Sequence, residues 1–320
     1  MDRLILNWSK VTLICLIIFI NCNANSQTKQ YLRVMRNLDN AKTLDTANMR
    51  ITYSLEFVDD STNSDKKWKD LKVLLIGNSM QHFYSYYSRL SDLSETENSK
   101  GTKSYRPLSA PSGVCAERYD IYYNFPEGKQ TVIENICLDR YVFKEELIVP
   151  EWIITSDTVT FLNYLCNKAV CHFRGRIWEV WFTPDIPINA GPWKLRGLPG
   201  LILKASDDRQ HYIFECTGIE NLKLSEPIIM YEWAFSAASN PAWKETREKY
   251  RKEQREFYEN YVNSLLSMGY DVFITDASGK MIEHVETPNT KFKEMKVSFP
   301  TVVNSKDRFR KIPYNPIELE

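Results

Sequence analysis

The chain has 320 residues, of which 43% are hydrophobic, 26% charged and 13% aromatic, and its formal net charge is zero. This length and composition are ordinary for a globular protein with one large domain or two small ones. The 41 basic residues are balanced by 41 acidic ones, and no basic stripe or nucleic-acid-reading motif indicates a nucleic-acid partner. Beyond the N-terminus, no apolar run approaches the roughly 20 residues of a membrane-spanning helix.

The N-terminus has the parts of a secretory signal peptide. Two basic residues, Arg3 and Lys10, precede an unbroken apolar block at 11–20 (VTLICLIIFI), and an A-x-S pattern ends at Ser26. Residues 1–26 therefore predict export, with cleavage near Ser26 and a location in the periplasm or cell envelope. An uncleaved membrane anchor is the alternative, although the block is short for a span. A lipoprotein site is disfavoured because the residue before Cys22 is not small.

Cysteines are few in the part of the chain that follows the signal peptide. Five remain there: Cys115, Cys137, Cys166, Cys171 and Cys216. An odd number in an oxidising compartment allows two disulfides and one free thiol, with the pairing undetermined. Cys166 and Cys171 have opposite parity on a predicted strand, so we expect that they do not pair with each other.

A period-two hydrophobic pattern begins near Met49 and predicts a series of antiparallel hairpins. One hairpin turns at 77–79 (GNS), and the polar stretches at 61–65 and 91–104 are interpreted as loops. The expected strands lie at 51–57, 71–76, 81–87, 119–124, 130–137, 140–144, 161–173, 177–182, 201–205, 212–216, 270–275 and 280–285.

One segment has helical periodicity instead. Asn240 is a good N-cap, Pro241 suits the first helical position, Gly269 suits the end, and an aromatic stripe runs along one face. We predict one long amphipathic helix over 241–268, packed on a sheet, with a coiled-coil arm as the alternative. The expected fold of 27–320 is therefore a single mainly β (α+β) domain: one strongly curved antiparallel sheet or half-barrel with this helix against it.

Glycine and proline concentrate in the stretch 191–203 (GPWKLRGLPGLIL). Pro199 and Gly200 occupy the central positions of a predicted type II turn. Three prolines also stiffen 183–192, a long ordered loop of the kind that is often functional. The stretch either starts a core strand or forms the rigid rim of a ligand-binding groove. The residues of that rim would be Trp181, Asp185, Trp193, Arg196, Gly197, Pro199 and Gly200.

Catalytic signatures are scarce. None of the four histidines lies in H-E-x-x-H, and no G-x-S-x-G, phosphate loop, dinucleotide fingerprint or C-x-x-C occurs, so no cofactor is expected. Cys171 and His172 with His211 and Cys216 form a conceivable metal cluster, but buried thiols or disulfides are favoured over a metal site. Paired carboxylates would suit a hydrolase. The candidates are Asp157, Asp185, Asp207 and Asp208, of which the last two are more simply a hairpin turn.

The sequence around 191–203 resembles the GLPGLI family, exported proteins of uncharacterised function from Gram-negative bacteria. Supporting matches are FRGRIWEVWFTPDIPINAGP at 173–192, LIGNSMQHFYSYYSRLSD at 75–92 and YNPIELE at 314–320. One departure is Asn163, where the family more often has glycine before Tyr-x-Cys. The resemblance implies export and an envelope location, and members resemble companions of TonB-dependent outer-membrane transport genes. It supplies no catalytic residues.

These observations together predict a non-catalytic envelope protein that assists outer-membrane traffic. Its partner would be an apolar ligand or an outer-membrane transport protein, with at most peripheral membrane contact. The alternatives are an envelope hydrolase that uses carboxylates, and a structural or assembly factor whose helix docks a partner.

Overall fold

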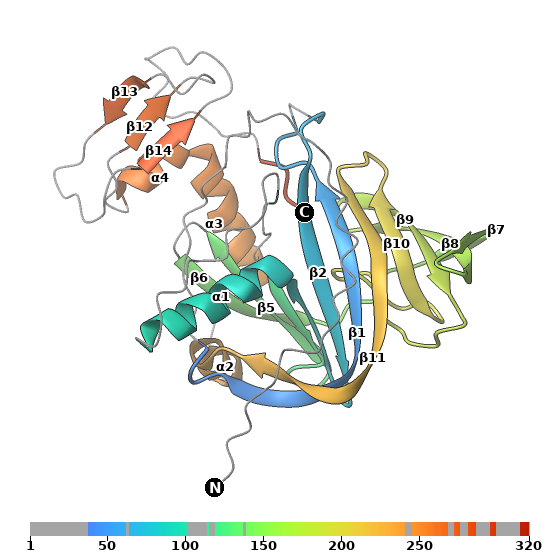
Figure 1. Ribbon diagram of the computed structural model, residues 1–320. Helices are drawn as coiled ribbons and strands as arrows, with labels where there is room; N and C mark the ends of the chain where they lie inside the picture. Colours follow the sequence, from blue (N-terminus) through green and yellow to red (C-terminus); the bar gives the residue numbers. More distant parts are fainter. Residues whose placement is uncertain are drawn as a thin grey trace, which may run out of the picture.

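The computed structural model describes residues 38–61, 64–100, 114, 119–136, 139–240, 245–267, 272–275, 281–285, 295–298 and 314–319. The described chain is mainly β (Figure 1). Its strands are β1 Lys42–Phe57, β2 Trp68–Gly77, β3 Gln81–Ser85, β4 Asp120–Tyr123, β5 Lys129–Ile136, β6 Asp139–Glu146, β7 Ile153–Phe161, β8 Tyr164–Phe173, β9 Arg176–Thr183, β10 Leu201–Asp207, β11 Tyr212–Met230, β12 Val272–Thr275, β13 Met281–Val285 and β14 Met295–Ser298.

The first eleven strands form one antiparallel sheet, as the hairpin pattern predicts. Their order is β6-β5-β4-β3-β2-β1-β11-β10-β9-β8-β7, and the sheet is not closed. A separate three-stranded sheet pairs β12 with β13 antiparallel and with β14 parallel. The predicted hairpin near residues 270–285 corresponds to β12 and β13.

The long central strands β1 and β11 bend the sheet. They pair with each other through three register irregularities, including one between Ala47 and Met49. Such bulges bend a strand and increase its twist. Figure 1 shows both strands curving round the lower edge of the molecule.

The curved sheet surrounds the larger of two hydrophobic cores. This core holds Phe143 of β6 and Trp178 of β9, which come from opposite ends of the strand order. The Tyr123 hydroxyl donates to the carbonyl of Trp193, and Arg174 lies 2.8 Å from Glu145, so polar contacts also join the two ends. Because both ends meet over one core, the open sheet is strongly curved.

A smaller core lies on the opposite sheet face. The helix α2, Glu232–Ser239, places Ala234 and Ala237 there, beside Val73 and Leu75 of β2. Alternate residues of β2 thus enter different cores, since Leu74 belongs to the larger one. Both faces of this half of the sheet are covered.

The prediction of one long helix over 241–268 is wrong. Asn240 ends α2, and residues 241–244 and 268 lie outside the described residues. Two shorter helices follow, α3 at Arg247–Glu259 and α4 at Tyr261–Ser267, with Thr246 as the N-cap of α3. Asn260 interrupts them at φ −121° and ψ 37°, and its side chain donates to the Glu256 carbonyl at 3.3 Å. Asparagine competes for backbone hydrogen bonds in this way, which makes it a poor helix-interior residue.

The predictions for 81–87 and 91–104 also need correction. The strand ends at Ser85, and the helix α1 occupies Tyr86–Ser99, while 101–104 lie outside the described residues. The Ser85 hydroxyl accepts from the Ser88 amide at 3.2 Å, as an N-cap does. Asp92 and Thr96 are buried despite being polar, because Thr96 donates to the Asp92 carbonyl and Tyr231 donates to the Asp92 carboxylate. A polar buried face leaves no hydrophobic periodicity to detect.

Two-residue turns join β7 to β8 and β8 to β9. Leu162 and Asn163 have φ of 51° and 65°, and Arg174 and Gly175 have φ of 53° and 76°. Positive φ at both positions is the type I′ hairpin pattern. Asparagine tolerates this conformation, so Asn163 forms the turn at which the resembling family more often has glycine.

The predicted type II turn at Leu198–Leu201 is wrong. The Gly200 amide, not that of Leu201, donates to the Leu198 carbonyl, at 2.8 Å, which closes a three-residue γ-turn on Pro199. The Leu201 amide donates instead to Ile186 at 3.0 Å. Leu201, the first residue of β10, is thus bonded to the loop that precedes the turn.

Close backbone approach explains the clustered glycines in this segment. A Cβ on Gly200 would overlap the Thr183 carbonyl and lie 3.0 Å from Pro184 Cα. A Cβ on Gly191 would lie 2.5 Å from the Leu195 carbonyl oxygen, and one on Gly197 would overlap Val149. Each glycine therefore allows the loop to fold tightly against a neighbouring segment.

Residues 314–319 are fastened to this loop and to the sheet by buried polar groups. Arg176 Nη1 lies 2.5 Å from Asp207, and its other nitrogens donate to Asn315, Pro316 and Ile317. The Asn315 side chain in turn donates to the Val58 carbonyl at 2.6 Å. The segment therefore bridges β1, β9 and β10.

Glu318 is the centre of a buried ion cluster. Its carboxylate lies 2.6 Å from both Lys194 and Arg247 and 3.3 Å from Arg251, and its side chain is 1% exposed. Lys194 also pairs with Glu145 of β6. Burial alone would raise the pKa of Glu318, but the three cations hold it well below the usual range. The cluster joins the glycine-rich loop, α3, β6 and residues 314–319.

We predict that Glu318→Gln lowers the free energy of unfolding by about 3–5 kcal/mol at pH 7, because it leaves buried cations uncompensated. The lowered pKa means that this stabilisation is complete above the unfolded-state value of about 4.3 and is lost as the pH falls through the folded-state value. Urea unfolding between pH 7 and about pH 3 should therefore show a steeper acid loss in the native protein than in the variant.

The control for this measurement is Glu56→Gln, which removes an exposed ion pair with Lys69. A change of less than about 1 kcal/mol is expected there. Equal losses in the two variants, or parallel acid profiles for Glu318→Gln and the native protein, would contradict the central role of Glu318.

Gly200→Ala should lower the free energy of unfolding by about 2 kcal/mol or more, because the added methyl group meets backbone atoms that cannot move aside. Gly218→Ala is the matched control, since the nearest atom to its added Cβ is 3.9 Å away. Its expected effect is within about 0.5 kcal/mol. Denaturant unfolding compares the two, and similar values would refute the close-approach explanation.

Candidate functional site

The structure places the two tryptophans of the predicted rim in different environments. Trp193 is 2% exposed and packs in the larger core, with ring centroids 5.3 Å from Trp178 and 5.7 Å from Phe173. Trp181 is half-buried, and the amine of Lys168 lies 5.8 Å from its ring centroid. Trp178 is buried on β9 while Trp181, three residues on, is half-buried, so the two rings lie on opposite sides of the strand.

The other predicted rim residues are divided between packing and exposure. Gly197 and Gly200 pack against Val149 and the backbone at Thr183, as described above. Asp185 and Pro199 are exposed. The Asp185 amide donates to the Thr183 hydroxyl at 3.3 Å. Burial differs from one of the seven residues to the next, and their role in ligand binding stays a prediction.

Arg196 differs from the rest of the set. Its carbonyl accepts from the Trp152 indole nitrogen at 2.7 Å, and its guanidinium lies 5.1 Å from the Tyr123 ring centroid. The side chain is half-buried, and burial lowers its pKa below the usual value. Arg196 is thus the member of the predicted rim that combines charge with partial burial.

The four carboxylates proposed for hydrolysis do not converge. Asp207 is fully buried, pairs with Arg176, and accepts from the amides of His211 and Tyr212 at 2.7 and 2.8 Å. Asp157, Asp185 and Asp208 are exposed. The interpretation of Asp207 as a turn residue is confirmed by these amide bonds and by the Gln210 amide, which donates to its carbonyl.

The cysteines and histidines considered as metal ligands also lie apart. Cys171 is buried while the adjacent His172 is exposed, and His211 is 3.2 Å from the Asn315 amide nitrogen. No group of three or more metal-binding side chains occurs within the described ranges.

Three buried thiols are free: Cys166, Cys171 and Cys216. Burial raises the pKa of Cys171 to about 12 and that of Cys216 to about 11, which keeps both protonated and unreactive. Cys166 and Cys171 do not pair with each other, as expected. Cys115 and Cys137 lie outside the described residues.

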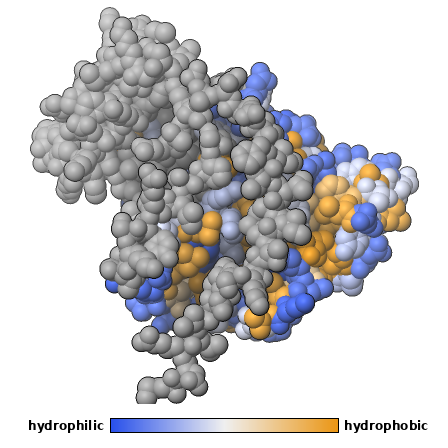
Figure 2. Space-filling view, in the orientation of Figure 1, coloured by the Kyte–Doolittle hydropathy of each residue, from blue (hydrophilic) through white to orange (hydrophobic). Residues whose placement is uncertain are grey.

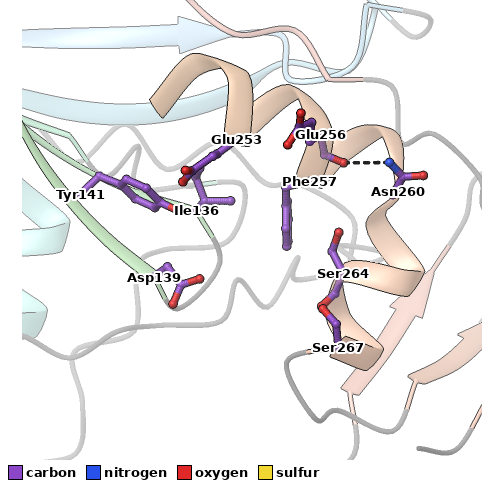
Figure 3. A pocket seen from close by; sticks show the side chains of 9 residues that line it. All are labelled: Ile136, Asp139, Tyr141, Glu253, Glu256, Phe257, Asn260, Ser264 and Ser267. Carbon is purple, nitrogen blue, oxygen red and sulfur yellow. Dashed lines mark hydrogen bonds between the residues drawn. The ribbon is translucent and has the colours of Figure 1, made fainter. Parts of the chain in front are cut away.

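A shallow open hollow of about 330 Å³ lies between the β5–β6 end and the α3–α4 break (Figure 3). Its acidic side chains face it from both sides, and burial together with a hydrogen bond to Glu253 raises the pKa of Tyr141. Such a lining can accept hydrogen bonds from hydroxyl or cationic groups. The lining residues are Ile136, Asp139, Tyr141, Glu253, Glu256, Phe257, Asn260, Ser264 and Ser267.

One edge strand of the large sheet is covered by helices, whereas the other has exposed apolar side chains. At one edge, β6 contacts α2 and α3, and Lys144 donates to the Ala238 carbonyl at 3.2 Å. At the other, β7 ends the strand order with apolar side chains in solvent: Ile153 is 71% exposed, Ile154 52% and Val159 41%. Leu165 of β8 adds a further exposed side chain, and Figure 2 shows hydrophobic surface over this end of the sheet.

An uncovered apolar edge is unusual, because unpaired strand backbone invites association. A register irregularity between Ile154 and Thr158 and the charge of Asp157 interrupt β7 at its middle. On either side of this interruption, the β-branched side chains of Ile153, Ile154 and Val159 stay exposed. The edge therefore has the properties of a surface to which an extended segment can add as a further strand.

Sequence reasoning missed both the ion cluster and the edge. Lys194 and Glu318 are 124 residues apart, so no local pattern links them. The β7 stretch 153–161 (IITSDTVTF) is rich in isoleucine, valine and threonine, and this composition was the available signal for a strand.

Comparison with known proteins gives limited matches. Residues 174–204 match the family model described as "Protein of unknown function (Porph_ging)". No curated protein matches the chain. No helix among the described residues is both long and apolar enough to cross a membrane.

Two solved structures of PNGF-II are similar to parts of the chain. The structure in space group P21 has 19% sequence identity and a TM-score of 0.36, covering 57% of this chain and 29% of that chain. The structure in space group C2 has 17% identity and a TM-score of 0.40, covering 66% and 34%. This chain therefore corresponds to about a third of the length of the PNGF-II chains it matches.

Proposed function

We propose that this chain is a non-catalytic protein of the cell envelope that binds an extended segment of a partner protein along the edge strand β7. The exposed isoleucine and valine side chains of this strand carry the proposal. Added strands gain affinity from main-chain hydrogen bonds and specificity from alternate side chains. A partner segment rich in β-branched or aromatic residues fits such an edge best.

The burial of the other polar clusters supports binding over catalysis. Two deeply buried carboxylates are paired with basic side chains and so connect distant parts of the chain. Asp207 pairs with Arg176, and Glu318 pairs with Lys194 and Arg247. Glu134, whose pKa is raised by burial, accepts from the Tyr250 hydroxyl beside the same cluster. These arrangements serve packing, and the hydrolase alternative gains no converging pair from the aspartates considered.

The concave face of the sheet gives no support to an apolar carrier function. Side chains of the 190–203 segment, α3, α4 and Ile317 fill the larger core there. The partner, rather than a lipid enclosed by the sheet, is therefore the proposed occupant.

The location and family are part of the proposal. The N-terminal pattern at 1–26 supports export, and the motif at 191–203 lies inside the matched range 174–204. We assign the chain to the GLPGLI family on this basis, with an outer-membrane transport protein as the proposed partner.

The proposal predicts a discrete photo-crosslink at the β7 edge in cells that make the protein naturally. A photoreactive amino acid replaces Leu165 of β8, which is 56% exposed beside the edge strand. In the control protein it replaces Leu224 of β11, which is 86% exposed away from that edge. We expect one adduct from position 165, none from position 224, and loss of the adduct when Val159→Lys adds a charge to the edge. Mass spectrometry identifies the adduct.

The outcomes separate the parts of the proposal. No adduct at position 165, an adduct insensitive to Val159→Lys, or an adduct of two copies of this chain would each overturn partner docking. An outer-membrane transport protein in the adduct would support the role in traffic, whereas another envelope protein would support docking and overturn that role.

A further inference from the structure

Arg196 carries a positive charge that is partly buried and has no counter-ion among the residues that the structure describes. Its Nη1 atom is buried and has no hydrogen-bond partner. The guanidinium faces the Tyr123 ring, and no carboxylate pairs with it in the part of the chain that the structure describes. The residue as a whole is only half-buried, so part of its surface is open to solvent.

Other buried cations of the protein are treated differently. Lys72 lies 3.0 Å from Asp70, Arg176 lies 2.5 Å from Asp207, and Lys194 lies 2.6 Å from Glu318. Removing a charge from water without a partner is unfavourable, and an aromatic ring compensates only part of it. An arginine left without an anion in a fold that supplies carboxylates elsewhere therefore needs an explanation.

The backbone that presents Arg196 is fixed on both sides. The Trp152 indole donates to the Arg196 carbonyl, and the Gly197 amide donates to the Asn189 side chain at 2.5 Å. Val149 packs against Gly197, where any side chain would displace it. The backbone that carries the Arg196 side chain is thus fixed before any ligand arrives, which reduces the entropy lost on binding.

We infer that Arg196 anchors an oxyanion, the carboxylate or phosphate group of a small ligand, where its guanidinium faces the Tyr123 ring. The planar guanidinium presents parallel N–H donors that match the oxygens of either group. The bound anion supplies the counter-charge that the described part of the chain does not. This site is separate from the β7 edge and goes beyond the function proposed above.

Isothermal titration of the purified chain with sodium phosphate and with sodium acetate, at constant ionic strength, tests the inference. We expect one anion per chain, and binding weakened roughly 30-fold or more by Arg196→Met. Arg209→Met is the control, because Arg209 is exposed in the β10–β11 turn. It should leave the affinity unchanged. A response to phosphate alone identifies a phosphate ligand, and a response to both anions identifies a general oxyanion site.

Three results would overturn the inference: no binding of either anion by the native chain, unchanged binding by Arg196→Met, or an equal loss with Arg209→Met. Thermal unfolding gives a second readout, since phosphate should raise the melting temperature of the native chain but not that of Arg196→Met. If Arg196→Met does not fold, Arg196→Gln takes its place with the same expectations. Neither measurement needs a partner protein, so the inference can fail while docking at β7 stands.

Discussion

The carboxylate of Glu318 is the point on which the arrangement of the fold depends. Three cations from two parts of the chain meet it, and Lys194 extends the contact to Glu145 of β6. Charges this deeply buried are stable only when every partner is present, so the cluster enforces one arrangement of loop, helix and sheet edge. The cluster specifies this geometry more than it adds net stability, because replacing a buried ion pair with well-packed hydrophobic residues often leaves a protein equally stable.

The curvature of the sheet and the glycine-rich loop follow from the same constraint. For Lys194 to reach Glu145, the ends of an open sheet must approach each other, and the loop that carries Lys194 must pack closely against β9 and β10. Gly191 and Gly200 make that packing possible. The glycine- and proline-rich stretch 191–203 is thus a tightly folded loop, which places Lys194 in the interior and leaves Arg196 half-buried.

The sequence predicts the strands whose buried residues follow a regular local spacing. Trp178, Val180 and Phe182 alternate on β9 and are all buried, because a period of two records one buried face. The break at Asn260 and the polar helix α1 depend on side-chain hydrogen bonds that hydrophobicity does not reveal. Arg176, Lys194 and Glu318 belong to residue types that are mostly exposed, and their partners lie more than thirty residues away, so neither composition nor spacing could place them inside.

The position of Glu318 and Asn315 in the chain has a consequence for the order of assembly. Residues 314–319 are synthesised after every other segment that the structure describes, and Glu318 supplies one of the two carboxylates that pair with Lys194. A chain made only as far as the earlier segments already contains Asp207 and Glu145 as partners for Arg176 and Lys194, but it lacks the Glu318 contacts that tie α3 to the glycine-rich loop. The docking of α3 on the glycine-rich loop through Glu318 is therefore among the last of the described contacts that can form as the chain is made.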